Sequence, residues 1–274
     1  MEHEKHKSIQ RIVIKIGTSS LTHSTGKLNY RGIEEMVSVV CDLKNMGYEI
    51  VLVSSGAIGV GLGKTGLQKK PAESAKKRAL AAIGQSSLMA VYEELFGVYN
   101  CKVAQVLLTK SALLDKANCD SIADAFTTMF EYGVLPIVNE NDVAAGNEAE
   151  SGDLFGDNDT LSAYVARFVS ANLLVIWSDI DGLYSRDPRT DAGAQIIPVV
   201  TKIDDELYKI AGGAGTSRSS KGRGGMHTKL DAARIAMAAG IDMIITNGDR
   251  PGNLYEILEG KEIGTLFKVN NSEG

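Results

Sequence analysis

The chain has 274 residues, of which 44% are hydrophobic, and it carries a formal net charge of −5. This composition can supply a sizeable core, either for one large α/β domain or for two small ones. The acidic balance and the absence of a long basic run argue against a nucleic-acid-binding protein. No apolar run approaches the ~20 residues of a membrane span, and the charged start lacks the apolar stretch of a secretory signal. Three widely spaced cysteines favour reduced thiols, so we expect a cytoplasmic protein with no membrane or nucleic-acid partner.

The first predicted strand, 11–16, is an apolar run that contains one lysine, Lys15. A lysine near the end of a buried strand either reaches solvent along its aliphatic stem or meets an anion. The turn after it, 17–20, consists of small residues whose backbone N–H groups can bind phosphate. A helix is expected over 31–43, because apolar residues recur there at helical spacing.

The next predicted strand, 49–53, runs into a similar turn of serine and glycine at 54–57. Two such turns on successive βα units build one edge of a parallel sheet. Beyond them, 61–66 matches the dinucleotide-binding pattern GxGxxG, but no strand directly precedes it and we do not interpret it as such a site. Residues 63–65 match the end of the P-loop motif GxxxxGK[ST]. The first glycine of that motif would fall at position 58, which is an isoleucine, so the motif is incomplete.

Strands and helices alternate over the rest of the chain, and no internal repeat interrupts them. Helices are expected over 71–96, 118–132, 205–210, 226–237 and 253–258, and strands over 102–108, 134–138, 173–177, 196–200, 242–246 and 264–267. The inward stripes of the two long helices are expected to contain Leu80, Ile83, Ser87, Leu88, Val91, Leu95 and Phe96, and Ile122, Ala125, Phe126, Met129 and Phe130. The alternation predicts one domain, 1–274, with a mostly parallel sheet and helices on both faces.

Two polar clusters lie near the middle of the chain. Residues 139–142 directly follow a predicted strand, and ligands of α/β sheets lie beyond the carboxyl ends of strands. Residues 157–159 precede a helical pattern, where Asn158 or Asp159 is the expected N-cap. Asn, Asp and Gly also dominate ordinary turns, so these clusters alone leave both interpretations open.

A segment rich in Gly, Ser, Lys and Arg, 212–225, is either a linker or an anion-binding loop. Its last glycines lead directly into a helix that contains Lys229. A glycine-rich loop that opens into a helix N-terminus is a ready anion site. We therefore favour phosphate binding over a linker.

Six strand-end motifs occur in order along the chain, at 13–19, 53–58, 138–142, 155–159, 178–184 and 224–229. Together they closely resemble the amino acid kinase family, and within it the glutamate 5-kinases, over essentially all of 11–267. The pair Asn-Glu-Asn-Asp and Gly-Asp-Asn-Asp favours this branch over the aspartate, acetylglutamate, carbamate and UMP kinases. The resemblance implies a three-layer αβα sandwich with a mainly parallel central sheet.

The same resemblance implies an activity. L-Glutamate and ATP, with Mg²⁺, would give L-glutamyl 5-phosphate and ADP, the first step of proline biosynthesis from glutamate. It further implies a homo-oligomer, for which helix 74–96 is a candidate contact, and feedback inhibition by proline at or near the glutamate site, where loop 144–152 is the candidate. The product would pass to glutamate-5-semialdehyde dehydrogenase.

The family's roles transfer to matching positions of this chain. The catalytic positions are Lys15, Lys229 and Asp159, of which Asp159 would organise the two lysines. The substrate positions are Ser55, Gly56, Asn139, Asp142 and Asn158. The nucleotide positions are Lys15, Gly17, Ser178, Asp179, Arg223, Gly224, Gly225, Met226, His227, Thr228 and Lys229. No metal ligand is assigned, because Mg²⁺ is often held mainly by phosphates and water.

Two features depart from the family pattern. Arg223 stands where relatives often have threonine, which leaves open whether it contacts phosphate or solvent. Many relatives also carry a C-terminal PUA domain, which we do not expect here. Three alternatives remain: a kinase with another acceptor such as UMP or another amino acid, a non-catalytic binding regulator on the same fold, and, least favoured, a nucleic-acid binder.

The implied reaction sets a clear chemical requirement. The acceptor carboxylate is already anionic, so it needs no general base. It has to approach a triphosphate, and two unit charges ~4 Å apart interact by about 4 kcal/mol at an effective dielectric constant of 20. Cations and N–H groups have to offset this repulsion, while positioning supplies much of the remaining catalysis. We expect Lys15 and Lys229 to flank the transferred phosphoryl group and Asp142 to bind the substrate ammonium.

Overall fold

The computed structural model describes residues 10–23, 25–67, 69–146, 157–212 and 225–269. The described strands form one sheet in the order β3-β4-β2-β1-β5-β7-β8-β6. Its strands are β1 (Arg11–Ile16), β2 (Glu49–Ser54), β3 (Val103–Leu108), β4 (Leu135–Glu140), β5 (Leu173–Ser178), β6 (Val199–Val200), β7 (Asp242–Asn247) and β8 (Thr265–Phe267). Neighbouring strands are parallel except β7 and β8, which are antiparallel. The predicted mostly parallel sheet is therefore confirmed.

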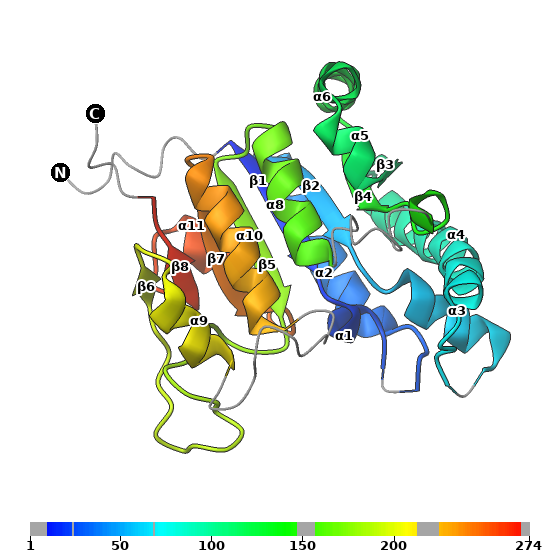
Figure 1. Ribbon diagram of the computed structural model, residues 1–274. Helices are drawn as coiled ribbons and strands as arrows, with labels where there is room; N and C mark the ends of the chain where they lie inside the picture. The colour runs from blue at the N-terminus through cyan, green and yellow to red at the C-terminus, as the bar shows by residue number, and fades with distance from the viewer. Residues whose placement is uncertain (1–9, 24, 68, 147–156, 213–224, 270–274) are drawn as a thin grey trace.

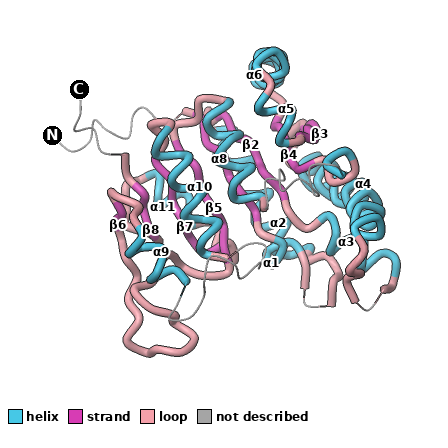
Figure 2. Tube along the Cα trace, in the orientation of Figure 1, coloured by secondary structure: helices cyan, strands magenta, loops and turns pink. Residues whose placement is uncertain are grey.

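Helices cover both faces of this sheet (Figures 1 and 2). They are α1 (Thr18–Leu21), α2 (Tyr30–Asn45), α3 (Ala57–Thr65), α4 (Ser74–Val98), α5 (Lys110–Leu114), α6 (Lys116–Glu131), α8 (Asn158–Phe168), α9 (Asp205–Gly212), α10 (Met226–Ala238) and α11 (Asn253–Leu258), with a 3₁₀ turn, η2, at Ala144–Gly146. Buried side chains of α2, α4 and α11 share one core with the sheet, and those of α6, α8 and α10 share the other. This confirms the αβα sandwich.

Strand β1 shows how the sheet separates its two cores. Ile12, Ile14 and Ile16 belong to the core with α2, while Val13 belongs to the core with α8 and α10. Successive side chains of a strand point to opposite faces. Lys15 therefore lies on the face of Val13, beneath the helices that follow the predicted polar clusters.

The segment that mimics GxGxxG is part of α3, a helix that the sequence pattern does not predict. A Cβ atom on Gly61 would lie 2.0 Å from the carbonyl oxygen of Leu80, and one on Gly84 would lie 1.8 Å from that of Ala57. Only glycine permits so close an approach between α3 and α4. These glycines therefore pack two helices together and do not form a dinucleotide turn.

Several local predictions were wrong. The turn at 17–20 is largely the short helix α1, and the strand expected at 196–200 is reduced to Val199–Val200. Ile83 is 39% exposed. The contact of Gly84 with α3 places Leu80, Gly84 and Leu88 on the buried face of α4, which leaves Ile83 outside that face. Ala125 is exposed, since α6 packs near the edge of the sheet, against β4, and turns Phe126 rather than Ala125 inward.

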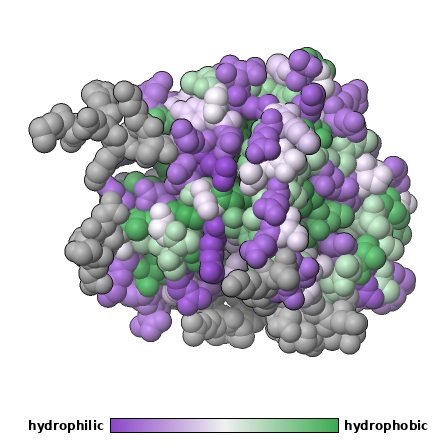
Figure 3. Space-filling model, turned by 90° about the horizontal axis from the view of Figure 1, so that it is seen from above, coloured by the Kyte–Doolittle hydropathy of each residue, from purple (hydrophilic) through white to green (hydrophobic). Residues whose placement is uncertain are grey.

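No helix in the described part of the chain combines the length and the apolar character that a membrane span requires. Strands β1, β2, β5 and β7 end toward the lower edge in Figure 1, where α1 lies. The view from above in Figure 3 shows polar and apolar residues interspersed on the opposite side.

Candidate active site

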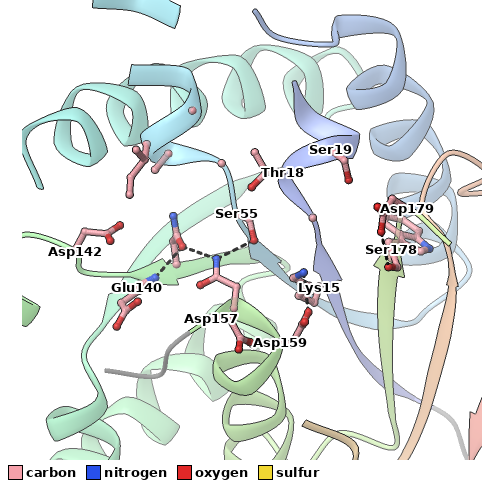
Figure 4. A pocket seen from close by; sticks show the side chains of 18 of the residues that line it. Lys15, Thr18, Ser19, Ser55, Glu140, Asp142, Asp157, Asp159, Ser178 and Asp179 are labelled. Carbon is pink, nitrogen blue, oxygen red and sulfur yellow. Dashed lines mark hydrogen bonds and ion pairs between the residues drawn. The ribbon is translucent and has the colours of Figure 1, made fainter. Parts of the chain in front are cut away.

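A cavity of about 460 Å³ opens at the carboxyl ends of β1, β2, β4 and β5. These parallel strands are neighbours in the sheet, so the turns that follow them meet at one edge. Eleven predicted site residues line the cavity: Lys15, Gly17, Ser55, Gly56, Asn139, Asp142, Asn158, Asp159, Ser178, Asp179 and Lys229. Figure 4 shows Asp142 on one side and Ser178 and Asp179 on the other, with Lys15 and Asp159 between them.

Asp159, in the first turn of α8, is fully buried and contacts both lysines. Its Oδ1 lies 2.7 Å from Nζ of Lys15, and its Oδ2 accepts a hydrogen bond of 3.1 Å from Nζ of Lys229. The hydroxyl of Thr228 also lies 2.9 Å from Oδ2. Burial opposes ionisation of this carboxyl, but the attraction of Lys15, and then of Lys229, holds the pKa of Asp159 below its usual range. The three ionised groups together carry one net positive charge at the cavity.

Asp157 caps α8 by accepting a hydrogen bond of 2.9 Å from the backbone N–H of Thr160. The prediction that Asn158 or Asp159 is the N-cap was therefore wrong, because the side chains of both turn to other partners. Burial, and then the charge of Asp159, raises the pKa of Asp157 to about 6. Asp157 also lines the cavity and is mostly ionised at neutral pH.

The side of the cavity near Ser55 contains a network of neutral hydrogen-bonding groups. The amide nitrogen of Asn158 donates to the carbonyl oxygen of Ser54 at 2.6 Å and to Oδ1 of Asn139 at 2.9 Å, with the hydroxyl of Ser55 at 3.1 Å. Asn139 in turn donates to Oε1 of Gln85 on α4 at 2.8 Å. These bonds join the ends of β2 and β4 to the start of α8.

Gly56 has a φ of 93°, in the left-handed region that favours glycine. This conformation lets the chain turn sharply from β2 into α3, whose first turn borders the cavity. Backbone N–H groups at the start of a helix lack partners within that helix, so they are available to an anion. The backbone N–H groups at the start of α1, directly after Gly17, are available to an anion for the same reason.

Residues 10–247 match the amino acid kinase family. The chain belongs to the amino acid kinase family. It is 48% identical to a glutamate 5-kinase from Clostridium perfringens over 97% of this chain and 98% of that protein. It is also 48% identical to a glutamate 5-kinase from Carboxydothermus hydrogenoformans, covering 95% of this chain and 68% of that protein.

Solved structures of this fold are more distant in sequence. A UMP kinase from Ureaplasma parvum superposes with a TM-score of 0.62 at 17% identity, over 95% of this chain and 99% of that one. An isopentenyl phosphate kinase from T. acidophilum superposes with a TM-score of 0.61 at 15% identity, over 94% and 100%. At such low identity these likenesses show the fold alone, and they agree with the predicted αβα architecture.

The predicted nucleotide residues divide into three groups in this amino acid kinase. Ser178 and Asp179 line the cavity, and Asp179 lies 3.8 Å from the guanidinium of exposed Arg189. Residues 225–228 do not line it; His227 packs edge-on against Tyr208, with ring centroids 5.8 Å apart. Arg223 and Gly224 lie outside the described residues. The nucleotide roles of Gly225, Met226, His227 and Thr228 stay predictions.

The sequence reasoning missed several residues at this site. Gln85 contacts Asn139, while Lys70, Glu140 and Asp157 line the cavity. A glutamine within the apolar stripe of α4 was a usable signal, because buried polar side chains require partners. Lys70 has no such signal, since it lies in the connection between α3 and α4 and reaches the cavity only through the tertiary fold.

Proposed function

We infer that the protein transfers the γ-phosphoryl group of ATP to the side-chain carboxylate of L-glutamate, giving L-glutamyl 5-phosphate and ADP. The observation that carries this proposal is one cavity that joins the Lys15–Asp159–Lys229 cluster, of net positive charge, to a side lined by amides and bordered by the carboxylate of Asp142. The kinase family implies ATP as the donor. Relatives named glutamate 5-kinase, 48% identical over nearly the whole chain, support glutamate as the acceptor.

The charged cluster explains how two anions are brought together. Lys15 and Lys229 approach Asp159 from β1 and α10, so each ammonium is held in place before ATP arrives. Asp159 neutralises only one of the two, and the remaining charge offsets the repulsion between carboxylate and triphosphate. Such preorganised cations, together with in-line positioning, account for most phosphoryl-transfer catalysis.

We propose Mg²⁺ as the accompanying cation. Within the described residues, no three His, Cys, Asp or Glu side chains are grouped to hold a metal ion by themselves. This fits a Mg²⁺ ion that keeps several waters and binds phosphates plus one carboxylate, such as that of Asp157 on the cavity wall. When bound, the ion neutralises charge on the phosphate oxygens.

The acceptor side favours an amino acid over a nucleotide. Asp142 and Glu140 add carboxylates to the side of the cavity that contains Ser55, Asn139 and Asn158. A carboxylate attracts an ammonium group and repels a phosphate. An acceptor such as UMP, which carries its own phosphate, therefore suits this side less well than L-glutamate does.

Further parts of this proposal concern the enzyme's setting. We propose one catalytic domain that acts in the cytoplasm at the first step of proline biosynthesis, with its product passed to glutamate-5-semialdehyde dehydrogenase. Exposed apolar residues at the ends of α4 and α6, Val98 at 75% and Tyr132 at 71% exposure, support a homo-oligomer. Inhibition by proline is proposed near Asp142, where η2 begins the 144–152 segment; residues 147–152 lie outside the described part.

The test is ADP release by the purified protein with Mg-ATP, with and without L-glutamate, in the presence of hydroxylamine. Hydroxylamine converts an acyl phosphate into a hydroxamate, so the expected result is glutamate-dependent ADP together with hydroxamate. A folded protein that binds ATP but makes no hydroxamate from glutamate would overturn the acceptor. A screen of other amino acids and UMP would then identify the acceptor that it uses.

A further inference from the structure

Gln85 lies behind the acceptor side of the cavity and takes no part in the mechanism described above. It is 8% exposed and sits in the middle of α4, among residues that are mostly apolar. Burying a carboxamide costs free energy unless its polar atoms are hydrogen-bonded. Its Oε1 accepts a hydrogen bond of 2.8 Å from Asn139, which is 4% exposed and lines the cavity. Gln85 is thus tied to the site without touching it.

The orientation of the Asn139 carboxamide follows from its contact with the backbone. The N–H of Glu140 can only donate, and it lies 2.9 Å from Oδ1 of Asn139. The atom of Asn139 that faces Gln85 is therefore Nδ2, which can only donate. Gln85 has to present its oxygen to this nitrogen. The positions of oxygen and nitrogen in both carboxamides are therefore assigned from their hydrogen-bond partners.

The same logic extends to Asn158. The carbonyl oxygen of Ser54 can only accept, so the Asn158 atom 2.6 Å from it is Nδ2. This nitrogen also donates to Oδ1 of Asn139 at 2.9 Å, and the two bonds use both of its hydrogens. Asn158 lines the cavity, and among the described residues no hydrogen bond is made to its Oδ1. The oxygen of this amide is therefore left to accept from a ligand.

We propose that Gln85 is a positioning residue for the acceptor substrate: through Asn139 it holds the carboxamide of Asn158 with its oxygen available to the cavity. The proposal rests on the proposed function, since an oxygen acceptor beside the carboxylate of Asp142 suits the ammonium group of an amino acid. A carboxylate or phosphate in this place would meet two acceptors and gain no hydrogen bond. Gln85 thereby favours an amino-acid acceptor without adding charge.

Loss of the Gln85 oxygen has a defined consequence. It leaves Nδ2 of Asn139 buried without an acceptor, and such an unsatisfied donor carries a substantial desolvation penalty. Asn139 then gains by rotating toward another acceptor, which withdraws its Oδ1 from Asn158. The Asn158 amide is no longer restrained to one orientation, so the substrate meets an amide nitrogen for part of the time.

The decisive variant is Gln85→Met, which keeps the unbranched side chain but replaces the acceptor oxygen with a methyl group. We expect the KM for L-glutamate to rise about tenfold or more, a change that corresponds to ~1.4 kcal/mol of binding free energy. The kcat and the KM for ATP are expected to stay near their wild-type values. Selectivity for L-glutamate over glutarate, which lacks the ammonium group, is expected to fall.

Two variants separate positioning from a general packing role. Gln85→Glu keeps an acceptor oxygen in either protonation state, so it is expected to restore the low KM for glutamate. Ser87→Ala, on the same helix, removes a contact with Lys64 and a hydrogen bond to the carbonyl oxygen of Ile83, both at the surface, and is expected to match the wild type. An unchanged glutamate KM in Gln85→Met, no recovery in Gln85→Glu, or a parallel loss of kcat and both KM values would overturn the proposal.

Hydroxamate formation by the wild type, measured in the same series, separates this proposal from the proposed function. If the wild type makes hydroxamate and Gln85→Met keeps the wild-type KM, only the role of Gln85 fails. If the wild type does not phosphorylate L-glutamate, the proposed acceptor fails. The KM of Gln85→Met for the acceptor that the wild type does use then decides the role of Gln85, because an unchanged value overturns it.

Discussion

Both sides of the cavity are polar, but one is organised around a buried ion cluster and the other around a network of neutral amides. On the phosphate side, one carboxylate at 0% exposure holds two lysines at 7% and 5% exposure. On the acceptor side, Gln85, Asn139 and Asn158 are joined by amide hydrogen bonds. The first arrangement leaves a net charge, whereas the second leaves an oriented dipole.

This difference matches what each side has to do. A triphosphate needs charge compensation, and a buried ion cluster is costly to assemble but strong once formed. An amino acid needs to be oriented, and directional amide bonds give orientation without the desolvation cost of further ions. Disrupting the charged side should therefore affect both stability and turnover, while disrupting the amide side should mainly affect substrate affinity.

The largest effect is expected for Asp159→Asn, which leaves two buried lysines without a counter-charge. Breaking a buried ion pair in this way typically costs about 3–5 kcal/mol of unfolding free energy. We expect a loss of that order in urea unfolding at pH 7, together with loss of turnover. Because the pKa of Asp159 is lowered in the folded state, the wild type loses this advantage as the pH falls, and the two proteins should converge in acid. Equal stability at pH 7 would show that Asp159 is not the lysines' counter-charge.

Lys229→Ala is expected to reduce kcat by about 10²–10³, the usual effect of removing one electrostatic contact to a transition state. The fold should persist, because Lys15 still neutralises Asp159. Initial rates with saturating ATP and glutamate measure the effect. Lys209→Ala, which removes an exposed lysine on α9, serves as the matched control. Near-normal kcat in Lys229→Ala would remove Lys229 from the catalytic role.

Asp142→Ala is expected to act on affinity rather than turnover. Losing a charged hydrogen bond to the substrate ammonium costs ~1.5–3 kcal/mol, which raises the KM for L-glutamate about 10–100-fold. The KM for ATP should not change, since the nucleotide side lies across the cavity (Figure 4). Asp124→Ala on the exposed face of α6 is the control. If Asp142→Ala kept its glutamate KM, another group would have to bind the ammonium.

The smallest effect is a gain in stability. Asn is as good an N-cap as Asp, so Asp157→Asn keeps the cap of α8 while removing a buried charge next to Asp159. Since the folded-state pKa of Asp157 is raised from 3.8 to about 6, the wild type loses stability as the pH rises between these two values, and the loss is complete above pH 6. We expect the variant to be more stable by roughly 1–3 kcal/mol at pH 8, with the difference shrinking as the pH falls and vanishing below about pH 3.

Thermal and urea unfolding across this pH range check the Asp157 prediction. If the difference in unfolding free energy between Asp157→Asn and the wild type did not depend on pH, the ionisation of Asp157 would not be its cause. Activity gives a second readout, because a Mg²⁺ ligand at Asp157 predicts that Asp157→Asn needs more Mg²⁺ for half-maximal rate.

Local sequence patterns pointed to some of the residues on the two sides of the cavity but not to their partners. The pairing of Lys15 with an anion was one of two open interpretations, and the structure identifies that anion as the carboxylate of Asp159. Gln85 was overlooked, although it is a polar residue in an apolar stripe. Asp157 was quoted within a motif but given no role. For Lys15 and Gln85 the partner lies on another element, and spacing along the chain carries no information about it.

By itself, the sequence determined the alternation of strands and helices and the placement of polar turns after strands. It did so because side-chain periodicity and turn chemistry act over a few residues. The tertiary structure decided which helix faces which strand, and with it the close approach of α3 and α4 at Gly61 and Gly84, the exposure of Ile83 and the meeting of Lys15, Asp159 and Lys229. These features depend on packing between segments far apart in the chain, where close packing and burial, rather than local propensity, select the arrangement.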